Sequence, residues 1–353
     1  MYLSLSKLLS FLIFSKCALG YHNRFSRSTT PASRLIHQFP NPTWIENLVV
    51  TSSNQVLVTD VTNPYLYLID PSISESDPSS NSTATLVHSF SPELSLLGIT
   101  ELYPSRFYVI TRNFTLTSKA SVTTGVNTIY SVDLTAYNAS NNTGAVVSKV
   151  AIVSSAGSLN GLTTLSSAQN LIIAADAIYG FIYSINVETS EYKILIDEPE
   201  LKPPNSTSLA FGVNGLKVLA CPDDADLVYI YFTNTGLTLF GRIPFSLTTL
   251  EVTGPVEILS DQYGPDDFAL DVERNVAYIA YGGGASVLEI GLDGGEVTTL
   301  IGGLNETTLS GPTSVGLGRA GEGLGWIYVS QSGKTNGVYT QGGKVLAVDV
   351  GGS

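Results

Sequence analysis

Histidine, cysteine and basic side chains are scarce in this chain of 353 residues, which has 3 histidines, 2 cysteines and 17 lysines and arginines. The 30 acidic residues leave a formal net charge of -13. Nucleic acids and anionic membranes bind clustered lysine and arginine, and no basic run occurs here, so the composition argues against both partners. Two cysteines exclude a disulfide framework. Because Cys17 lies in the N-terminal leader, we expect Cys221 to remain as a lone thiol.

The few histidines also limit the chemistry. His22, His37 and His88 lie near the N-terminus or in strands that we expect on the outside of the fold, which disfavours a central histidine as general base. No Gly-x-Ser-x-Gly motif provides a nucleophilic serine at a strand-to-helix turn. After the first twenty residues, no apolar run is long enough to cross a bilayer. The catalytic groups that remain are carboxylates, a bound metal ion and phenols.

The first twenty residues are typical of a secretory signal peptide: Lys7 precedes an apolar run from Leu8 to Phe14, and small residues follow at Ala18-Leu19-Gly20. We therefore expect a signal peptide over 1–20, an N-terminal segment over 21–32, one domain over 33–353, and entry into the secretory pathway or secretion. The expected N-glycosylation sites are the asparagines of six sequons, Asn81, Asn113, Asn138, Asn141, Asn205 and Asn305.

Short apolar strands make up the rest of the chain, and six of them open with a polar residue between apolar ones. These openings are Ile45-Glu46-Asn47-Leu48, Ile99-Thr100-Glu101-Leu102, Leu159-Asn160-Gly161-Leu162, Val213-Asn214-Gly215-Leu216, Pro265-Asp266-Asp267-Phe268 and Pro312-Thr313-Ser314-Val315. Further short strands follow each opening, with Gly, Asn, Asp and Pro between them and no helical period. The pattern predicts an all-β fold.

The spacing of the openings predicts a six-bladed β-propeller with four antiparallel strands in each blade. The sixth unit ends after three strands, and we expect Ser33–Phe39 to supply its outer strand and close the ring. A β-helix or a β-sandwich is the alternative.

In a closed ring of blades, equivalent positions meet around one axis. Asparagine and carboxylate oxygens suit a hard divalent cation such as calcium, which gives a candidate metal set. In the alternative, these residues only shape tight strand entries through local hydrogen bonds. The candidate metal ligands are Glu46, Asn160, Asn214 and Asp266.

The loops on the same face as the openings supply further candidates, because loops often carry function. The candidate catalytic residues are Arg112, Tyr179, Tyr281 and Asp266. The candidate substrate-binding residues are Trp44, Thr100, Asp176, Asn234, Thr313 and Tyr339. For each aromatic residue the alternative is packing with a satisfied polar tip, and for Arg112 it is an ordinary solvated loop arginine.

Four of the openings resemble the metal-ligand segments of the gluconolactonase and senescence-marker-protein (regucalcin-like) propellers. The resemblance rests on Glu46-Asn47-Leu48, the Asn-Gly-Leu openings at Asn160 and Asn214, and Pro265-Asp266-Asp267. It implies that Glu46, Asn160, Asn214 and Asp266 occupy positions that hold calcium or another divalent ion in that family. Asp267 departs from the pattern, because the family usually has glycine there.

A fungal secreted branch of these propellers resembles the chain more closely, through Trp44-Ile45-Glu46-Asn47, Asp266-Asp267-Phe268-Ala269-Leu270-Asp271 and Gly342-Gly343-Lys344-Val345. That branch includes hetero-Diels–Alderases of tropolone–sesquiterpenoid biosynthesis. The resemblance implies an enzyme that joins a tropolone quinone methide to a humulene-type alkene, acts on small lipophilic metabolites and requires no cofactor. The alternatives are a lactonase that depends on calcium or another divalent cation, and a noncatalytic binding propeller.

Overall fold

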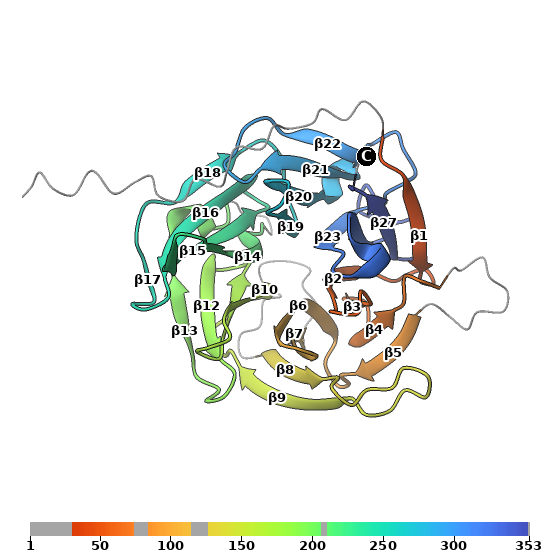
Figure 1. The fold of residues 1–353 in the computed structure, drawn as a ribbon, viewed down its shortest axis with the longest axis horizontal. Helices are drawn as coiled ribbons and strands as arrows, with labels where there is room; N and C mark the ends of the chain where they lie inside the picture. The colour runs from red at the N-terminus through yellow and green to blue at the C-terminus, as the bar shows by residue number, and fades with distance from the viewer. Residues whose placement is uncertain (1–29, 74–83, 114–125, 206–209, 352–353) are drawn as a thin grey trace, which may run out of the picture.

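Six β-sheets surround a central axis in the computed structural model, which describes residues 30–73, 84–113, 126–205 and 210–351 (Figure 1). The expected six-bladed propeller is confirmed. The expected signal peptide and Asn81 lie outside the described residues. The asparagines of the other five sequons, Asn113, Asn138, Asn141, Asn205 and Asn305, are exposed.

Each blade begins with the strand nearest the axis and continues outward. Blade 1 contains β2 (Ile45–Val50), β3 (Val56–Asp60), β4 (Tyr65–Ile69) and β5 (Ala84–Ser89). Blade 2 contains β6 (Ser95–Tyr103), β7 (Arg106–Arg112), β8 (Asn127–Asp133) and β9 (Val146–Ile152). Blade 3 contains β10 (Leu159–Ser166), β11 (Leu171–Asp176), β12 (Phe181–Asn186) and β13 (Tyr192–Ile196).

The remaining blades follow the same order. Blade 4 contains β14 (Val213–Cys221), β15 (Asp224–Asn234), β16 (Leu239–Ser246), β17 (Glu251–Val252) and β18 (Glu257–Ser260). Blade 5 contains β19 (Phe268–Asp271), β20 (Val276–Tyr281), β21 (Ser286–Gly291) and β22 (Thr298–Gly302). Blade 6 contains β23 (Pro312–Leu317), β24 (Trp326–Gln331), β27 (Lys344–Asp349) and β1 (Ser33–Gln38). Short 3₁₀ turns lie between strands at Pro199–Leu201, Gly282–Gly284 and Gly321–Gly323.

The N-terminal strand closes the ring as expected. β1 pairs antiparallel with β27, with Ser33 opposite Val348 and Gln38 opposite Lys344. Blade 6 therefore combines both ends of the domain, and the outer edge of its last C-terminal strand is covered rather than left open to another chain.

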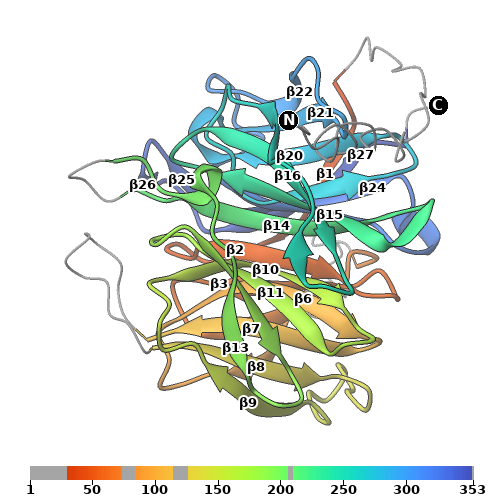
Figure 2. The same cartoon turned by 90° about the vertical axis from the view of Figure 1, so that its left-hand side faces the viewer.

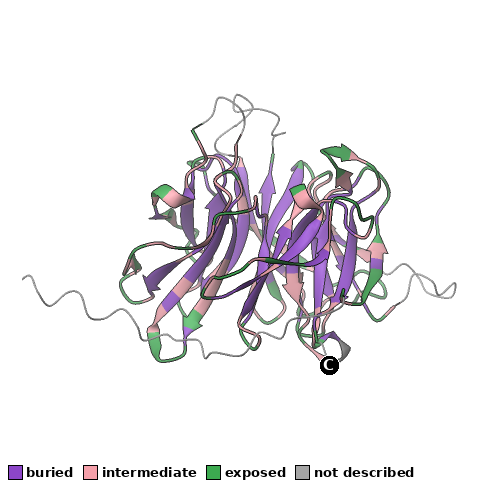
Figure 3. Cartoon of the chain, turned by 90° about the horizontal axis from the view of Figure 1, so that it is seen from above, coloured by how far each residue is buried: buried purple, intermediate pink, exposed green. Residues whose placement is uncertain are grey.

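The hydrophobic core lies between neighbouring blades, because successive side chains of a strand point to opposite faces of its sheet. In β20, Tyr278 and Ala280 pack toward blade 6, whereas Ala277 and Ile279 pack toward blade 4. The described residues form six such clusters, one for each interface between blades. Figure 3 shows the resulting pattern of buried strands between more exposed loops at the two faces.

Cys221 is buried in a disulfide bond, so the expected lone thiol is wrong, and its partner lies outside the described residues. His37 and His88 lie in the outer strands β1 and β5, as expected. Among the described residues, none belongs to a helix with the length and hydropathy needed to cross a membrane.

Candidate functional site

A β-bulge interrupts the innermost strand of five blades near its start. The register shifts fall between Ile45 and Asn47, Leu96 and Ile99, Leu159 and Leu162, Val213 and Leu216, and Pro312 and Ser314. A bulge adds a residue to one strand and re-aims its side chain, so it turns the bulged residue toward the axis. In blade 5 the corresponding residues, Asp266 and Asp267, lie just before β19.

Six equivalent residues at these bulges form what we call the ring: Glu46, Leu97, Asn160, Asn214, Asp266 and Thr313. The expected member from blade 2, Thr100, is wrong. It lies three residues further along β6, pairs with Tyr108 and contacts the Thr164 hydroxyl at 3.3 Å. Blade 2 therefore contributes an apolar side chain, Leu97, to the ring.

Hydroxyl groups on the second strand hold the bulges in place. Thr59 Oγ1 accepts a hydrogen bond from the Asn47 amide at 3.1 Å and donates to the Leu97 carbonyl of the next blade at 2.6 Å. Thr233 Oγ1 likewise accepts from the Gly215 amide at 2.8 Å and donates to the Asp266 carbonyl of the next blade at 2.7 Å. These bonds satisfy the amides that the bulge removes from the strand ladder, so the ring is fixed from blade to blade.

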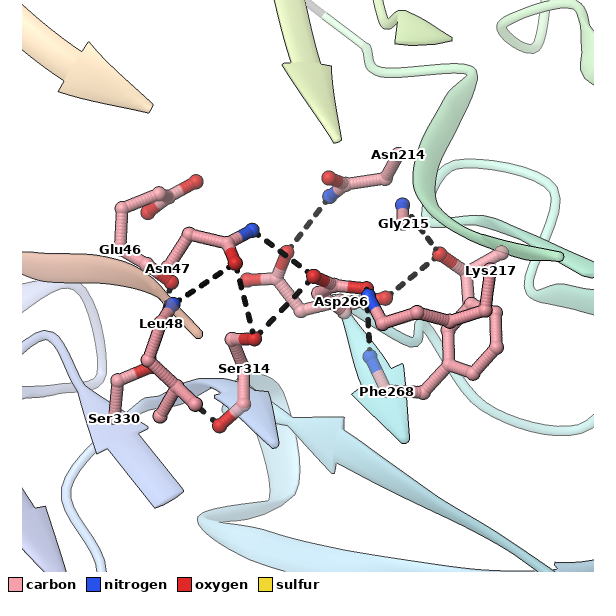
Figure 4. Close-up of polar contacts among 12 residues, drawn as sticks. Glu46, Asn47, Leu48, Asn214, Gly215, Lys217, Asp266, Phe268, Ser314 and Ser330 are labelled. Atoms are coloured by element: carbon pink, nitrogen blue, oxygen red, sulfur yellow. Dashed lines mark hydrogen bonds and ion pairs between the residues drawn. The ribbon is translucent and has the colours of Figure 1, made fainter. Parts of the chain in front are cut away.

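Two carboxylates of the ring are poorly compensated. Asn214 Nδ2 donates to Asp266 Oδ1 at 2.8 Å, but Glu46 Oε2 is buried without a hydrogen-bond partner (Figure 4). Desolvation raises the pKa of Glu46, although the Trp44 indole N–H, Arg112 and Asn160 lower it in part. Desolvation, followed by repulsion from Glu46 and Asp267, raises the pKa of Asp266 well above its ordinary value of 3.8.

Two cations accompany Glu46. Arg112, the last residue of β7, is buried and donates from Nη1 to Ser158 Oγ at 3.1 Å. Lys334 Nζ lies 4.0 Å from the centre of the Trp44 ring and 4.6 Å from that of Tyr339. Desolvation lowers the pKa of both cations, and Glu46 raises it. Sequence reasoning placed Arg112 and the two aromatic residues at this face but missed Lys334.

A short hairpin positions Lys334 and Tyr339. β25 (Lys334–Thr335) and β26 (Val338–Tyr339) form a two-stranded sheet that stands out from one face of the propeller, which we call the upper face (Figure 2). Asn336 and Gly337 connect the strands with φ of 50° and 78°. Asn-Gly favours this left-handed turn, so the local sequence itself brings Lys334 and Tyr339 opposite each other.

A second set of residues lies further along the inner strands, toward the opposite or lower face, and we call it the floor: Asn47, Lys217, Asp267 and Ser314. Lys217 follows the ring residue of its blade by three positions, and the other three follow theirs by one. Lys217 Nζ donates to Asp267 Oδ1 at 2.7 Å, and Asn47 Nδ2 donates to Asp267 Oδ2 at 2.9 Å. Ser314 Oγ also contacts Asp267 Oδ2, at 3.3 Å. The unusual Asp267 is thus the hub of a satisfied polar network.

Three expected substrate-binding residues form hydrogen bonds within the protein. Asp176 is fully buried and accepts four backbone N–H bonds, from Gly157, Ser158, Ile178 and Tyr179. Asn234 is fully buried and joins the carbonyls of Glu200 and Lys202 to the amide of Leu237. Thr313 donates to the Ile45 carbonyl at 2.8 Å and so links blade 6 to blade 1. Their polar atoms are engaged within the protein.

Tyr179 and Tyr281 lie at strand ends on the upper face. Tyr179 is 40% exposed in the turn after β11, and its ring packs over Gly157. Tyr281 ends β20 and packs against Tyr263 at 5.3 Å between ring centres. By contrast, Trp44 and Arg112 act on the pKa of Glu46, and Glu46 acts on that of Tyr339.

The donor chemistry of the ring fits a divalent cation. In the described part of the chain, no group of three or more His, Cys, Asp and Glu side chains is placed to hold a metal ion, but the ring combines two carboxylates with two amides. Glu46 Oε2 is a buried acceptor without a donor, and Asn160 faces the same carboxylate. All-oxygen sets of this kind suit calcium rather than zinc or copper.

Comparison with known proteins places the fold. No family model matches the sequence, and no curated protein sequence matches it. Solved structures of similar shape include a luciferin-regenerating enzyme (16% identity, 90% of this chain and 95% of that one, TM-score 0.61). They also include the calcium-binding protein regucalcin from Agrobacterium tumefaciens (14% identity, 92% of this chain and 96% of that one, TM-score 0.58). A third is the PQQ-bound aldose sugar dehydrogenase from Streptomyces coelicolor (13% identity, 91% of this chain and 99% of that one, TM-score 0.57). At these identities the similarity establishes the propeller fold.

Proposed function

We propose that this propeller is an enzyme that catalyses an intermolecular hetero-Diels–Alder cycloaddition between a tropolone quinone methide and a humulene-type sesquiterpene. The observation that carries the proposal is the grouping of two cationic donors, Arg112 and Lys334, with the aromatic side chains Trp44 and Tyr339 at the upper side of the ring. The resemblance in the residues around Glu46 and Asp266 supports the choice of substrates.

The chemistry of this reaction suits the groups present. The O=C–C=C unit of the quinone methide and the C=C bond of the alkene form one C–O and one C–C bond, and no atom leaves. No nucleophile and no net proton transfer are required. Catalysis comes from holding the two partners in a reactive pose and from hydrogen bonds to the oxygen on which negative charge develops. Arg112 supplies a charged donor beside Glu46.

The direct test is to incubate the purified protein with a quinone methide precursor and humulene. The expected result is an enantiomerically enriched adduct, formed roughly 100 times faster than the spontaneous reaction. Arg112→Met should slow the reaction, and Arg106→Met is its matched control, because Arg106 begins the strand that Arg112 ends and its side chain is 57% exposed. A racemic adduct at the background rate would overturn the proposal.

A divalent-metal-dependent lactonase is the second candidate, and the unpartnered Glu46 Oε2 favours it. Glu46, Asn160, Asn214 and Asp266 would hold the ion, which would polarise an ester carbonyl. This candidate expects calcium or manganese to raise the melting temperature, and lactone turnover to disappear with a chelator or with Glu46→Gln. Binding of small lipophilic ligands without either turnover would identify a noncatalytic binding propeller.

A further inference from the structure

Lys334 differs from Lys202 and Lys217 in how its charge is held. Lys202 pairs with Asp197 and Lys217 with Asp267. Within the part of the chain that the structure describes, the Lys334 ammonium makes neither an ion pair nor a hydrogen bond, although the residue is half-buried. Its three N–H groups therefore remain available as donors.

Aromatic faces hold this ammonium instead. Trp44 and Tyr339 approach Nζ at 4.0 and 4.6 Å from their ring centres, within the range of a cation–π contact. Such a contact stabilises the charge without consuming a conventional hydrogen-bond acceptor. The neighbouring Glu46 carboxylate also attracts the ammonium, so the cation is fixed beside the ring with spare donors.

The hairpin limits the movement of the lysine. Gly333, with φ of 73°, lies so close to the Gln341 carbonyl that a Cβ would stand 2.3 Å from its oxygen. The Lys334 amide donates to Ser332 Oγ at 3.3 Å, and Lys334 pairs with Tyr339 across β25 and β26. Both ends of the short strand are therefore anchored, which favours one placement of the side chain over the ring.

We propose that Lys334 binds the carbonyl oxygen of a flat, conjugated, oxygen-rich ligand of the tropolone class beside the ring. This inference deepens the proposed function and, in its catalytic consequence, rests on it. In the cycloaddition, the ammonium donates a hydrogen bond to the quinone methide oxygen as that oxygen gains negative charge and becomes the ether oxygen of the new ring. No proton is transferred, and the donor is released when the adduct leaves.

Binding of tropolone itself tests the inference without requiring turnover. Trp44 and Trp326 are the 2 tryptophans of the chain, so Trp326→Phe leaves Trp44 as the fluorescent reporter beside Lys334. We expect tropolone to quench this emission, and Lys334→Met to weaken its affinity at least ~10-fold, as loss of a charged hydrogen bond does. Lys334→Arg should restore most of the affinity, which separates donor loss from damage to the hairpin.

Lys193→Met, on exposed β13, removes the same charge far from the ring and should leave tropolone affinity unchanged. Equal affinity of wild type and Lys334→Met for tropolone would overturn the inference. Equal loss in the methionine and arginine variants would also overturn it, because the effect would then follow from the hairpin rather than from the donor.

Turnover distinguishes the inference from the function on which it rests. If wild type forms the adduct, Lys334→Met should lower kcat roughly 100-fold, as removal of an oxyanion donor does, and Lys334→Arg should lower it less. Adduct formation with an unchanged kcat/KM in Lys334→Met would overturn the inference and leave the cycloaddition standing. Binding of tropolone through Lys334 without adduct formation by wild type would overturn the cycloaddition and support the inference.

Discussion

Asp266 and Asp267 are neighbours in the sequence, but their surroundings differ. Asp266 belongs to the ring, has a single amide partner in Asn214 and has a pKa raised well above its ordinary value by desolvation and by Glu46. Asp267 belongs to the floor and contacts Lys217, Asn47 and Ser314 through its two oxygens. Asp266 thus has one amide donor, whereas Asp267 has an ammonium, an amide and a hydroxyl group as partners.

Along the propeller axis, the residues expected to serve function lie in the ring, and those expected to serve stability lie in the floor. Buried polar groups are normally satisfied, and exceptions concentrate where a ligand, an ion or a reaction uses them. The floor follows the rule and joins blades 1, 4, 5 and 6. The ring above it departs from the rule at Glu46, whose Oε2 has no hydrogen-bond partner, and the pKa of its second carboxyl, Asp266, is raised. We therefore expect substitutions in the floor to affect folding and substitutions around the ring to affect chemistry.

The largest expected loss of stability comes from Lys217→Met in the floor. It leaves the Asp267 carboxylate, whose side chain is only 4% exposed, without its ammonium partner. Breaking a buried pair typically costs about 3–5 kcal/mol, and the partial exposure of Lys217 reduces the expected cost to about 2–3 kcal/mol. Urea unfolding measures it, with Lys193→Met as the exposed control. A loss below that of the control would contradict the assignment of the floor.

Arg112→Met is expected to act on chemistry more than on folding. Arg112 is the buried cation whose charge lowers the pKa of Glu46. Its loss should lower kcat/KM for adduct formation roughly 30-fold, the effect expected of one charged donor to a developing oxyanion. Steady-state kinetics and melting curves, with Arg106→Met beside it, separate the two effects. A fully active Arg112→Met protein would remove this residue from the proposed site.

The pH dependence of stability should carry a signal from the ring. In the unfolded chain Asp266 ionises near 3.8, whereas the native protein retains its proton to higher pH. The unfolded state therefore binds fewer protons in this window, and stability falls as pH rises through it. With a chelator present, the stability of wild type should fall more than that of Asp266→Asn as the pH rises above 3.8. Parallel pH curves would contradict the raised pKa.

The smallest effect is expected at the lower face. Arg319 forms an ion pair with Glu101 and donates to the Val50 carbonyl at 3.0 Å, but its side chain is 47% exposed. Exposed pairs contribute little, so Arg319→Ala should cost less than about 1 kcal/mol and leave turnover unchanged. Urea unfolding and the adduct assay measure both quantities. A loss comparable to that of Lys217→Met would mean that the lower end of the axis is as important as the floor.

The fold could be predicted because each blade repeats the same physical pattern. Strands such as Val276–Tyr281 bury alternate residues on two interfaces, and turns with left-handed asparagines at 54, 170 and 275 end the first strand of their blades. The closing role of Ser33–Phe39 followed from the missing outer strand and is confirmed by β1. The alternation within each strand and the closure of the ring by β1 therefore predict the same fold.

The ring could be predicted only where its members are polar. In blade 2 the ring position is occupied by Leu97, so the polar pattern pointed to Thr100. Gly98 was the available signal, because it aligns with the glycines of Asn160-Gly161 and Asn214-Gly215. A Cβ on Gly98 would stand 2.2 Å from the Asn160 carbonyl oxygen, which explains the glycine physically. The bulge, and not the polarity, defines the position.

Lys334, Asp176 and Asn234 show why loop chemistry is harder to predict. A loop lysine is ordinarily solvated, and only the fold brings Trp44 from blade 1 against the hairpin that carries Lys334. Asp176 and Asn234 stand at the expected strand ends, yet their polar atoms are taken up by local backbone groups. The identity of a polar side chain does not reveal whether its partners are internal.

The most direct measurement of the contrast between ring and floor compares the free energies of unfolding of Asp266→Asn and Asp267→Asn at pH 7 in a chelator. Asp266→Asn should be as stable as wild type, within about 0.5 kcal/mol, or more stable, because it removes a poorly compensated charge. Asp267→Asn should lose at least about 1.5 kcal/mol, since it removes a charged hydrogen-bond acceptor from Lys217. Equal losses in the two variants, or a larger loss in Asp266→Asn, would contradict the separation of a functional ring from a structural floor.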